Sequence, residues 1–352
     1  MITRTMLAPP TPAVLPETLS ANFSEFDLIR QFFVRPTQHT TLSIGDDGAL
    51  LTPTPGHELV VSTDLLVEGT HFFPDADPFD IGWKALAVNV SDMAAMGATP
   101  RWATLAAVLP APTFPWLEAF SRGFFACAES FNVDLIGGDT TRGPRTFCVT
   151  ILGEVPAGQA LRRDGAKLGD MIWVSGTPGR AALGLAHLQG RAAAIQPPLD
   201  TGQLEQCLIA LHRPQPRVAL GLALRGLASA AIDISDGLLA DLGHILAASA
   251  GTAQLQIPHL PPEGFARDSY LAGGDDYELI FTAPTEHSET IAALATTLDL
   301  PLTCIGKITG QSMANGNTKN GSLGKLPENA LVILDASGQI ITPTRRGFDH
   351  FK

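Results

Sequence analysis

The sequence predicts an α/β (α+β) protein built from two mixed α/β domains. Short apolar runs with the length of strands alternate with longer runs of helical periodicity along both halves of the chain. The chain has 352 residues, a length that predicts two domains. Charged residues make up 16% and hydrophobic residues 45%, a balance typical of a compact folded protein.

Residues 1–22 are predicted to form a disordered leader. They are rich in proline and contain no sustained apolar segment, so they lack the pattern of a signal peptide. A short helix is expected next, because Ser24 is a suitable N-cap and Phe26, Ile29 and Phe33 recur at helical spacing.

The rest of the first domain, 23–156, is predicted to alternate between strands and helices. Pro78 is tolerated in the first turn of a helix and Gly97 is a good helix end, which together predict a helix over 77–97. Apolar runs predict the other elements, namely strands at 58–62, 102–109, 133–136 and 146–155 and a helix at 115–130.

The second domain, 157–352, is expected to follow a boundary near Pro156-Ala157-Gly158. The same patterns predict strands at 171–175, 230–234 and 278–282, helices at 179–189, 203–211, 218–227, 237–249 and 288–298, and a terminal hairpin over 332–341. Residues 310–329 are rich in Gly, Asn, Ser and Lys, which predicts a flexible surface loop.

Composition narrows the class of protein. A formal net charge of -12 argues against general nucleic-acid binding, which requires basic surfaces. The four cysteines are widely spaced without a CxxC pair, so neither a disulfide framework nor a zinc site is indicated. No apolar stretch approaches the roughly 20 residues of a membrane-spanning helix, and a cytoplasmic protein is expected.

Acidic residues recur in short motifs through the first half. Gly45-Asp46-Asp47-Gly48 has the composition of a surface turn or of a metal-binding loop. Ser62-Thr63-Asp64 follows an apolar strand, where ligands of α/β proteins gather; an N-cap is the alternative. Asp92 lies in an otherwise apolar helix and must face water or a cation, because burying an unpaired carboxylate is costly.

Three further motifs follow a strand or turn. Leu135 to Gly143 (LIGGDTTRG) runs from an apolar strand into a double glycine, whose amides could bind a phosphate; a plain hairpin turn is the alternative. Ile232 to Gly237 (IDISDG) has two aspartates that could share a cation, and its Ser235 stands at a helix start suited to phosphate; a capped helix start is the alternative. The last motif is Gly273-Gly274-Asp275-Asp276.

Taken together, the motifs predict a carboxylate set that divalent cations hold together. Oxygen ligands without paired His or Cys favour Mg²⁺ over zinc. Mg²⁺ with carboxylates and glycine-rich turns is the apparatus of phosphoryl transfer. The chain has neither the GxxxxGK[ST] loop nor the HRD and DFG motifs of protein kinases. The set consists of Asp47, Asp64, Asp92, Asp139, Asp233 and Asp236.

These motifs, in this order, resemble those of thiamine-monophosphate kinase, a family in the superfamily that includes aminoimidazole ribonucleotide synthetase. The resemblance runs from about Phe23 to Phe351. Its most specific segments are IGDDGALL, STDLLVEGTHF, KALAVNVSDMAAMGATP, LIGGDTTRGP, IDISDGLLADLGHI, GGDDYEL and GFDHF.

The resemblance implies an ATP-dependent kinase that phosphorylates thiamine monophosphate directly, without a covalent intermediate. It implies a homodimer in which strands of the N-terminal domains pair across the subunits, with ATP and several Mg²⁺ ions between the two domains. The implied metal ligands are Asp47, Ser62, Thr63, Asp64, Asp92, Asp139, Asp233 and Asp236. The implied ATP contacts are Gly138, Asp139, Arg163 and Ser235. The implied acceptor contacts are His71, Asp275 and Phe348, where the family often has Glu in place of Asp275 and Trp or Tyr in place of Phe348.

Other functions remain open at this point. One is another ATP-dependent enzyme of the same superfamily, such as the synthetase of purine biosynthesis, which STDLLVEGTHF and GGDDYEL fit less well. A hydrogenase-maturation protein would need a C-terminal cysteine, and the chain ends His350-Phe351-Lys352. A non-catalytic nucleotide or metal sensor is the alternative from another class, and the complete set of six aspartates argues against it, because binding alone would need fewer.

Overall fold

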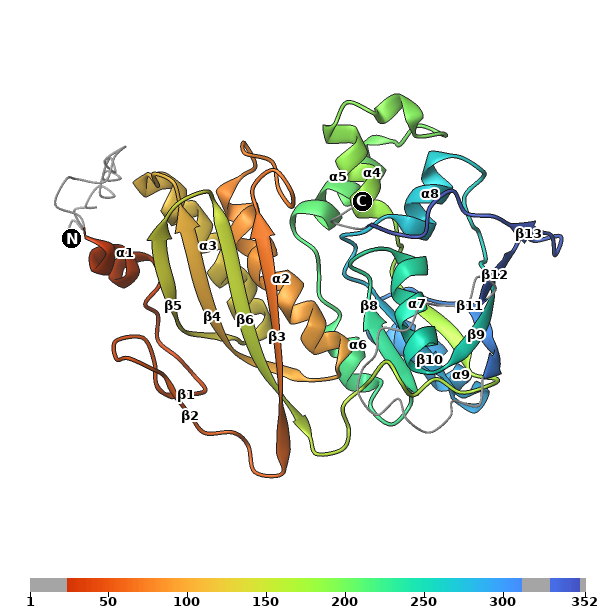
Figure 1. Ribbon diagram of the computed structural model, residues 1–352, viewed down its shortest axis with the longest axis horizontal. Helices are drawn as coiled ribbons and strands as arrows, with labels where there is room; N and C mark the ends of the chain where they lie inside the picture. The colour runs from red at the N-terminus through yellow and green to blue at the C-terminus, as the bar shows by residue number, and fades with distance from the viewer. Residues whose placement is uncertain (1–23, 312–329, 349–352) are drawn as a thin grey trace, which may run out of the picture.

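A computed structural model of the chain describes residues 24–311 and 330–348. The described residues form two halves that lie side by side, each with its own β-sheet (Figure 1). The expected leader over 1–22 and most of the expected loop over 310–329 lie outside the described residues. None of the described helices is long and apolar enough to cross a membrane.

The first half is a four-stranded sheet in the order β3-β6-β4-β5, preceded by a helix and a small hairpin. β4 and β5 are parallel, whereas β6 runs antiparallel to both of its neighbours. Its elements are α1 (Glu25–Phe32), β1 (Thr40–Leu42), β2 (Leu50–Leu51), β3 (His57–Val67), α2 (Pro78–Ala95), β4 (Thr99–Leu109), α3 (Phe114–Phe131), β5 (Asp134–Arg142) and β6 (Thr146–Pro156).

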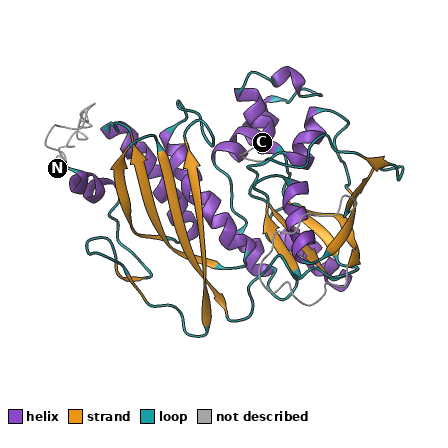
Figure 2. Cartoon of the chain, in the orientation of Figure 1, coloured by secondary structure: helices purple, strands orange, loops and turns teal. Residues whose placement is uncertain are grey.

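Helices α2 and α3 cover one face of this sheet (Figure 2). Both begin at side-chain caps: Asp77 accepts the amide of Phe79, and Thr113 accepts the amide of Trp116. The core between helices and sheet contains a stack of rings that includes Phe120 and Phe147, whose centroids are 4.4 Å apart. Burial of these apolar side chains holds the sheet against its helices.

The opposite face of the four-stranded sheet is apolar and open. Successive side chains of a strand point to opposite faces, and on β3 the outward set includes Leu59, Val61 and Leu65, which are 45%, 59% and 49% exposed. No helix of the described residues packs on this face (Figure 1). An exposed apolar row on a sheet is typical of an interaction surface.

The second half is a seven-stranded mixed sheet in the order β13-β12-β9-β11-β7-β10-β8, in which β9 and β12 are the parallel pair. The strands are β7 (Met171–Ser175), β8 (Ala230–Asp233), β9 (Gly251–Gln256), β10 (Leu279–Ala283), β11 (Leu302–Gln311), β12 (Leu331–Leu334) and β13 (Ile340–Ile341). The helices are α4 (Arg180–Leu188), η1 (Ala192–Ala194), α5 (Thr201–His212), α6 (Val218–Ala223), α7 (Leu238–Ala248), α8 (Phe265–Ala272), η2 (Thr285–His287) and α9 (Ser288–Thr297).

Both faces of this second sheet are buried. Along β7, Ile172 and Val174 point to the core that α7 covers, and Trp173 points to the core that α6 and α9 cover. The central strands are therefore continuous apolar runs without polar alternation, as expected of strands buried on both faces. That composition is the reason β7, β8 and β10 could be predicted from the sequence.

Helix α2 belongs to both halves. Its body packs on the first sheet, but Ala94 and Ala95 near its end lie in the core of the second half. The contact with α6 is close, since a Cβ on Gly221 would lie 2.0 Å from the carbonyl oxygen of Ala94. After the helix, the carbonyl of Met96 accepts the amide of Leu161 at 3.0 Å. Helix α2 and the residues directly after it thus connect the two halves.

The sequence-based expectations agree with most elements and miss others. The expected strand at 58–62 lies in the first half of the longer β3, and the helix expected over 218–227 ends at Ala223. Elements β1, β2, β9, α8 and β11 were not predicted. The expected loop over 310–329 is wrong at its first two residues, which end β11. The division into domains at about residue 156 stays a prediction.

Candidate active site

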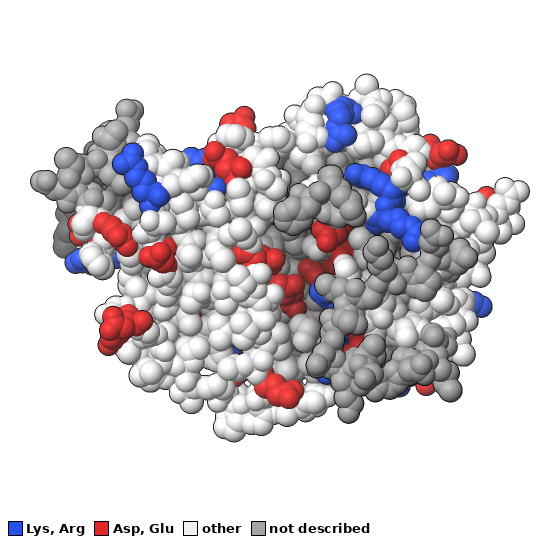
Figure 3. Space-filling view, in the orientation of Figure 1, with Lys and Arg blue, Asp and Glu red and all other residues white. Residues whose placement is uncertain are grey.

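Three aspartates from different elements meet at the seam between the halves. Asp64 comes from β3, Asp92 from α2, and Asp233 is the last residue of β8. Acidic side chains gather along this seam on the molecular surface (Figure 3). Asp64 and Asp92 are half-buried, and Asp233 is buried. The structure therefore brings together three of the predicted metal ligands.

Hydroxyl and amide groups orient these carboxylates. The Ser62 hydroxyl donates to Asp92, and the Ser91 hydroxyl donates to Asp233 at 2.7 Å. The backbone amide of Asp64 donates to the Asn89 side-chain oxygen at 3.1 Å. Ser62 was a predicted ligand and lies in contact with the cluster.

The electrostatic environment disfavours three negative charges here. Burial raises the pKa of Asp64 and of Asp233, and the neighbouring aspartates raise both further. Burial also raises the pKa of Asp92, while the Ser62 hydrogen bond and the Arg163 guanidinium lower it. Arg163, a predicted ATP contact, therefore lies close enough to the cluster to influence its charge. A bound cation would relieve the same repulsion.

Thr63 points away from this cluster. Because side chains alternate along β3, Ser62 and Asp64 share one face and Thr63 occupies the other. The Thr63 hydroxyl lies 2.8 Å from the hydroxyl of Thr150 on β6. Within the single chain, its side chain is not grouped with the other predicted ligands.

The turn after β8 is organised by a residue that the sequence reasoning missed. The backbone amides of Ser235, Asp236 and Gly237 all donate to one oxygen of Asp241, at 3.1, 3.0 and 3.0 Å. Burial, with the charges of Asp233 and Asp236, raises the pKa of Asp241 to about 8, against the effect of these amides.

The expected phosphate position at this helix start is therefore taken by a carboxylate of the chain itself. Ser235 and Asp236 of this turn are among the residues that line the cleft. Ligand atoms of Asp236, Asp241 and His244 lie within 4.8 Å of one another. An aspartate within the apolar helix start LLADL was the available signal for Asp241.

Asp47, Gly138 and Asp139 form a second group, apart from the seam. They line a separate hollow of about 1040 Å³ on the first half, beside α1. In the sheet register, Asp64 on β3 is paired with Val149 on β6. Val149 is in turn paired with Leu105 on β4, and Leu105 with Gly138 on β5. Three strand spacings correspond to about 14 Å. The six predicted carboxylates thus fall into two groups within one chain.

Gly138 has a structural reason to be glycine. Its φ is 152°, and a Cβ there would lie 1.8 Å from the carbonyl oxygen of Leu105 on β4. Any side chain would therefore push β5 off its neighbour. Close packing of two strands requires this glycine, whatever else the LIGGDTTRG motif binds.

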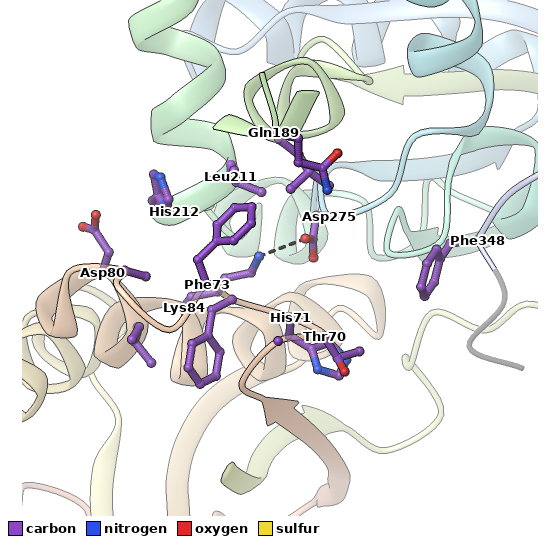
Figure 4. Close-up of a pocket in the computed structure, with 15 residues that line it drawn as sticks. Thr70, His71, Phe73, Asp80, Lys84, Gln189, Leu211, His212, Asp275 and Phe348 are labelled. Carbon is purple, nitrogen blue, oxygen red and sulfur yellow. Dashed lines mark hydrogen bonds and ion pairs between the residues drawn. The ribbon is translucent and has the colours of Figure 1, made fainter. Parts of the chain in front are cut away.

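His71, Asp275 and Phe348, the expected acceptor contacts, line one cavity. The cavity has a volume of about 210 Å³, lies between the halves, and has phenylalanine, leucine and isoleucine in its walls (Figure 4). The same three residues also line an adjoining space of about 390 Å³ that reaches Asp64 and Asp236. This cavity and the acidic seam are therefore parts of one cleft.

Local hydrogen bonds fix the cavity wall. The Nδ1 atom of His71 accepts the amide of Val67 at 3.0 Å, which leaves Nε2 as the protonated nitrogen when the ring is neutral. The amide of Phe348 donates to the carbonyl of Asp236 at 3.0 Å. This bond ties the chain near its end to the turn after β8, where the acidic seam begins.

Lys84 is the second functional candidate that the sequence reasoning missed. Its ammonium group pairs with Asp275 at 2.9 Å in the cavity wall (Figure 4). A lysine inside the apolar run KALAVNV, eight residues before Asp92, was the available signal. Eight residues are a little over two helical turns, so both side chains point to the same side of α2.

Comparison with known proteins agrees with this geometry. Two mixed α/β halves with acidic motifs at their seam define an AIR synthase-related protein, and residues 45–155 match the family model "AIR synthase related protein, N-terminal domain". The chain is 48% identical over 297 residues to the thiamine-monophosphate kinase of Salmonella typhimurium, covering 81% of this chain and 90% of that protein. It belongs to the thiamine-monophosphate kinase family.

Two solved structures are similar to the chain. The crystal structure of thiamine-monophosphate kinase from Stenotrophomonas maltophilia K279a is 52% identical, with a TM-score of 0.71 over 78% of this chain and 90% of that one. The structure of AaThiL complexed with AMPPCP and TMP is 26% identical, with a TM-score of 0.68 over 94% of this chain and 97% of that one.

Proposed function

We propose that this protein transfers the γ-phosphate of ATP to thiamine monophosphate, giving thiamine diphosphate and ADP. The observation that carries the proposal is the continuity of the acidic seam with the cavity that His71, Asp275 and Phe348 line. Family membership supports it, and so does the binding of AMPPCP and TMP by a relative of the same fold.

The donor set of the seam fits Mg²⁺. Asp64, Asp92 and Asp233 offer only carboxylate oxygens. Burial raises the pKa of all three, and neighbouring aspartates raise the pKa of Asp64 and Asp233 further. These three residues and Asp236 would hold the ions, with Ser62 beside them. When bound, Mg²⁺ supplies the positive charge that lets two polyanions approach each other.

The chain's own groups position the reactants. The acceptor phosphate oxygen is anionic at neutral pH, so no general base is needed and in-line transfer can be direct. Arg163 and Ser235 are proposed to contact ATP beside the seam. His71, Asp275 and Phe348 are proposed to hold the acceptor, which leaves its phosphate directed along the cleft toward Asp236.

We further infer that the working unit is a cytoplasmic homodimer. Thr63, Asp47, Gly138 and Asp139 are assigned to metal and nucleotide, yet they lie away from the seam of their own chain. The open apolar face of the first sheet supports pairing of the two N-terminal halves. In that arrangement, residues 23–156 form the dimerisation domain and residues 157–352 the second domain, with ATP between them.

The direct test is turnover of ATP in the presence of Mg²⁺, with and without thiamine monophosphate, with thiamine diphosphate as the measured product. We expect ADP and thiamine diphosphate to form in equal amounts and only when the acceptor is present. Asp233→Asn should abolish turnover while the protein remains folded. ATP hydrolysis at a rate that does not depend on thiamine monophosphate would contradict the proposal. So would turnover of aminoimidazole precursors in place of thiamine monophosphate.

A further inference from the structure

Lys84 is a buried cation in the wall of the acceptor cavity. Its side chain is only 5% exposed, and its Nζ lies 2.9 Å from Oδ2 of Asp275, which belongs to the other half of the molecule. Buried ion pairs of this kind contribute little net stability, because desolvation offsets their attraction. Packing alone therefore gives no reason for a lysine at this position of an apolar helix.

Asp275 is held in one orientation from both sides. While Lys84 contacts Oδ2, the Tyr277 hydroxyl donates to Oδ1 at 3.0 Å. The backbone is in the left-handed region at both residues, with φ of 69° at Asp275 and 53° at Tyr277. Their amides donate to Ser235 and Ile234, at 2.9 and 2.8 Å. Strained non-glycine residues fixed in this way are typical of functional sites.

The pair presents one acceptor and one donor side by side to the cavity. Each carboxylate oxygen has two lone pairs and the ammonium group has three hydrogens, so both Asp275 and Lys84 retain bonding capacity beyond their mutual contact. Around them the walls are mainly apolar, with Phe72, Phe73 and Leu211 among the lining residues. A flat ring with a donor next to an acceptor on one edge matches this wall.

We propose that Lys84 is a specificity-determining residue, which together with Asp275 recognises the aminopyrimidine ring of the acceptor through hydrogen bonds. This inference rests on the proposed function. The pyrimidine of thiamine monophosphate carries an amino group, a donor, beside a ring nitrogen, an acceptor. Asp275 accepts from the amino group, and Lys84 donates to the ring nitrogen. A ring with an oxo group and a protonated nitrogen has the reverse order of donor and acceptor.

The placement of Lys84 also fits the length of the acceptor. Eight residues of α2 separate it from Asp92, which corresponds to about 12 Å along the helix axis. An acceptor whose ring is held at Lys84 can therefore extend along the cleft, with its phosphate at the acidic seam. The helix thus sets the distance between the recognised ring and the reacting group.

The test compares two acceptors, thiamine monophosphate and oxythiamine monophosphate, in which an oxo group replaces the amino group. The first variant is Lys84→Met, which keeps the length of the side chain and removes its charge. The second is Lys84→Met/Asp275→Asn, which removes both charges of the pair and tests the same inference if the first variant folds poorly. Arg213→Met is the matched control, because Arg213 pairs with Asp80 across the same two halves at 3.2 Å and does not line the cavity.

We expect the parent protein to prefer the amino acceptor in kcat/KM. Lys84→Met should lower kcat/KM for thiamine monophosphate about 10- to 100-fold, the loss of a hydrogen bond to a charged group. The same substitution should lower kcat/KM for oxythiamine monophosphate much less, so the ratio of the two kcat/KM values becomes smaller. Binding of Mg·ATP should stay within about twofold of the parent value, and Arg213→Met should keep the preference.

Equal losses for both acceptors in Lys84→Met and in the double variant would overturn the inference and leave Lys84 as a structural ion-pair partner. No preference in the parent protein would overturn it as well. Failure of the parent protein to phosphorylate thiamine monophosphate at all would instead overturn the proposed function, so the two failures are distinguishable.

Discussion

Buried carboxylates of this protein differ in the groups that donate to them. Asp134, Glu154, Asp241 and Asp276 each accept backbone amides and thereby organise a turn or a loop. Glu278 accepts the hydroxyl of Ser175 and pairs with Arg217. Asp233 in the seam accepts the hydroxyl of Ser91 and has carboxylate neighbours. The carboxylates that accept backbone amides are of the structural kind, whereas Asp233 is proposed to bind a cation.

Asp241 allows a test of the structural kind. Asp241→Leu has a similar size but offers no acceptor, so three backbone amides lose their partner; that of Gly237 is buried and those of Ser235 and Asp236 are part-buried. An unsatisfied buried group costs about 1–3 kcal/mol, and we expect the free energy of unfolding to fall by about that amount. Urea unfolding measures this loss. Asp241→Asn keeps an acceptor oxygen and serves as the control, and equal stability of the two variants would contradict the assigned role.

Asp276 predicts a pH dependence of stability. It accepts the amides of Gly179 and Ala181 at the start of α4, yet burial raises its pKa to about 8. A carboxyl group with a pKa raised on folding binds a proton in the folded state that the unfolded chain has already lost. Its contribution to stability is therefore full below about pH 4 and declines as the pH rises toward 8.

The measurement is the urea midpoint of the parent and of Asp276→Asn at pH 5, 6.5 and 8. The asparagine cannot ionise, so the variant should lose less stability between pH 5 and 8 than the parent does. Asp299→Asn is the control, because it makes the same chemical change at an exposed position. Its urea midpoint should change with pH as that of the parent does. Parallel curves for Asp276→Asn and the parent would show that Asp276 does not titrate in this range.

At the scale of elements, the segment 38–54 is held at both ends by buried carboxylates. Asp134 at the start of β5 accepts the amides of Gln38 and His39 and the hydroxyl of Thr40. At the other end, Glu154 on β6 accepts the amide and hydroxyl of Thr54. The exposed turn with Asp46 and Asp47 lies between these two anchors.

Loss of either anchor should loosen this segment. In Asp134→Ala or Glu154→Ala we expect amide hydrogens of residues 38–54 to exchange about tenfold faster, since one lost hydrogen bond contributes about 1 kcal/mol or more. Hydrogen–deuterium exchange with mass spectrometry measures these exchange rates directly. Glu58→Ala removes a similar carboxylate–amide bond, to Gly158, outside the segment and should not change it. An unchanged rate in both anchor variants would refute the two-point attachment.

The sequence predicted the elements whose patterns are local. β7 and β10 are continuous apolar runs, and α2 begins at Asp77-Pro78, so each could be identified without tertiary information. β9 and β11 were missed because GTAQLQ and LTCIGKITGQ mix glycine and polar residues, and only their neighbours in the sheet make them strands.

The candidate site was predictable in its parts and not in its arrangement. The motifs around Asp64, Asp92 and Asp233 identified the seam, because acidic residues in apolar surroundings need partners. The separation of Asp139 from them depends on strand order, which one sequence does not reveal. The roles of Asp241 and Lys84 depend on backbone geometry and on a contact across the halves, which the motifs that contain these residues do not reveal.

At the scale of the whole molecule, the open sheet face predicts the oligomeric state. Val61, at the middle of the exposed row on β3, is 59% exposed in the single chain. Val61→Lys should place a charge in the proposed dimer interface, and we expect a monomer of low activity in light scattering and turnover assays. Leu168→Lys is the control, because Leu168 is 63% exposed but lies on the second half, outside the proposed interface. We expect the Leu168→Lys variant to remain dimeric. An active monomer of the parent protein would exclude the dimer.

Helix α2 has a consequence for how the cleft works. It carries Lys84 and Asp92, and its two ends are packed into the cores of different halves. A rigid rod fixed at both ends cannot bend or pivot without opening one of these cores. Lys84 and Asp92 are therefore held at a fixed spacing along one helix, and contact points that are fixed before binding reduce the conformational entropy lost when a ligand binds. An acceptor of the proposed kind must then match this spacing in length, in addition to matching Lys84 and Asp275 in the order of hydrogen-bond donor and acceptor on its ring.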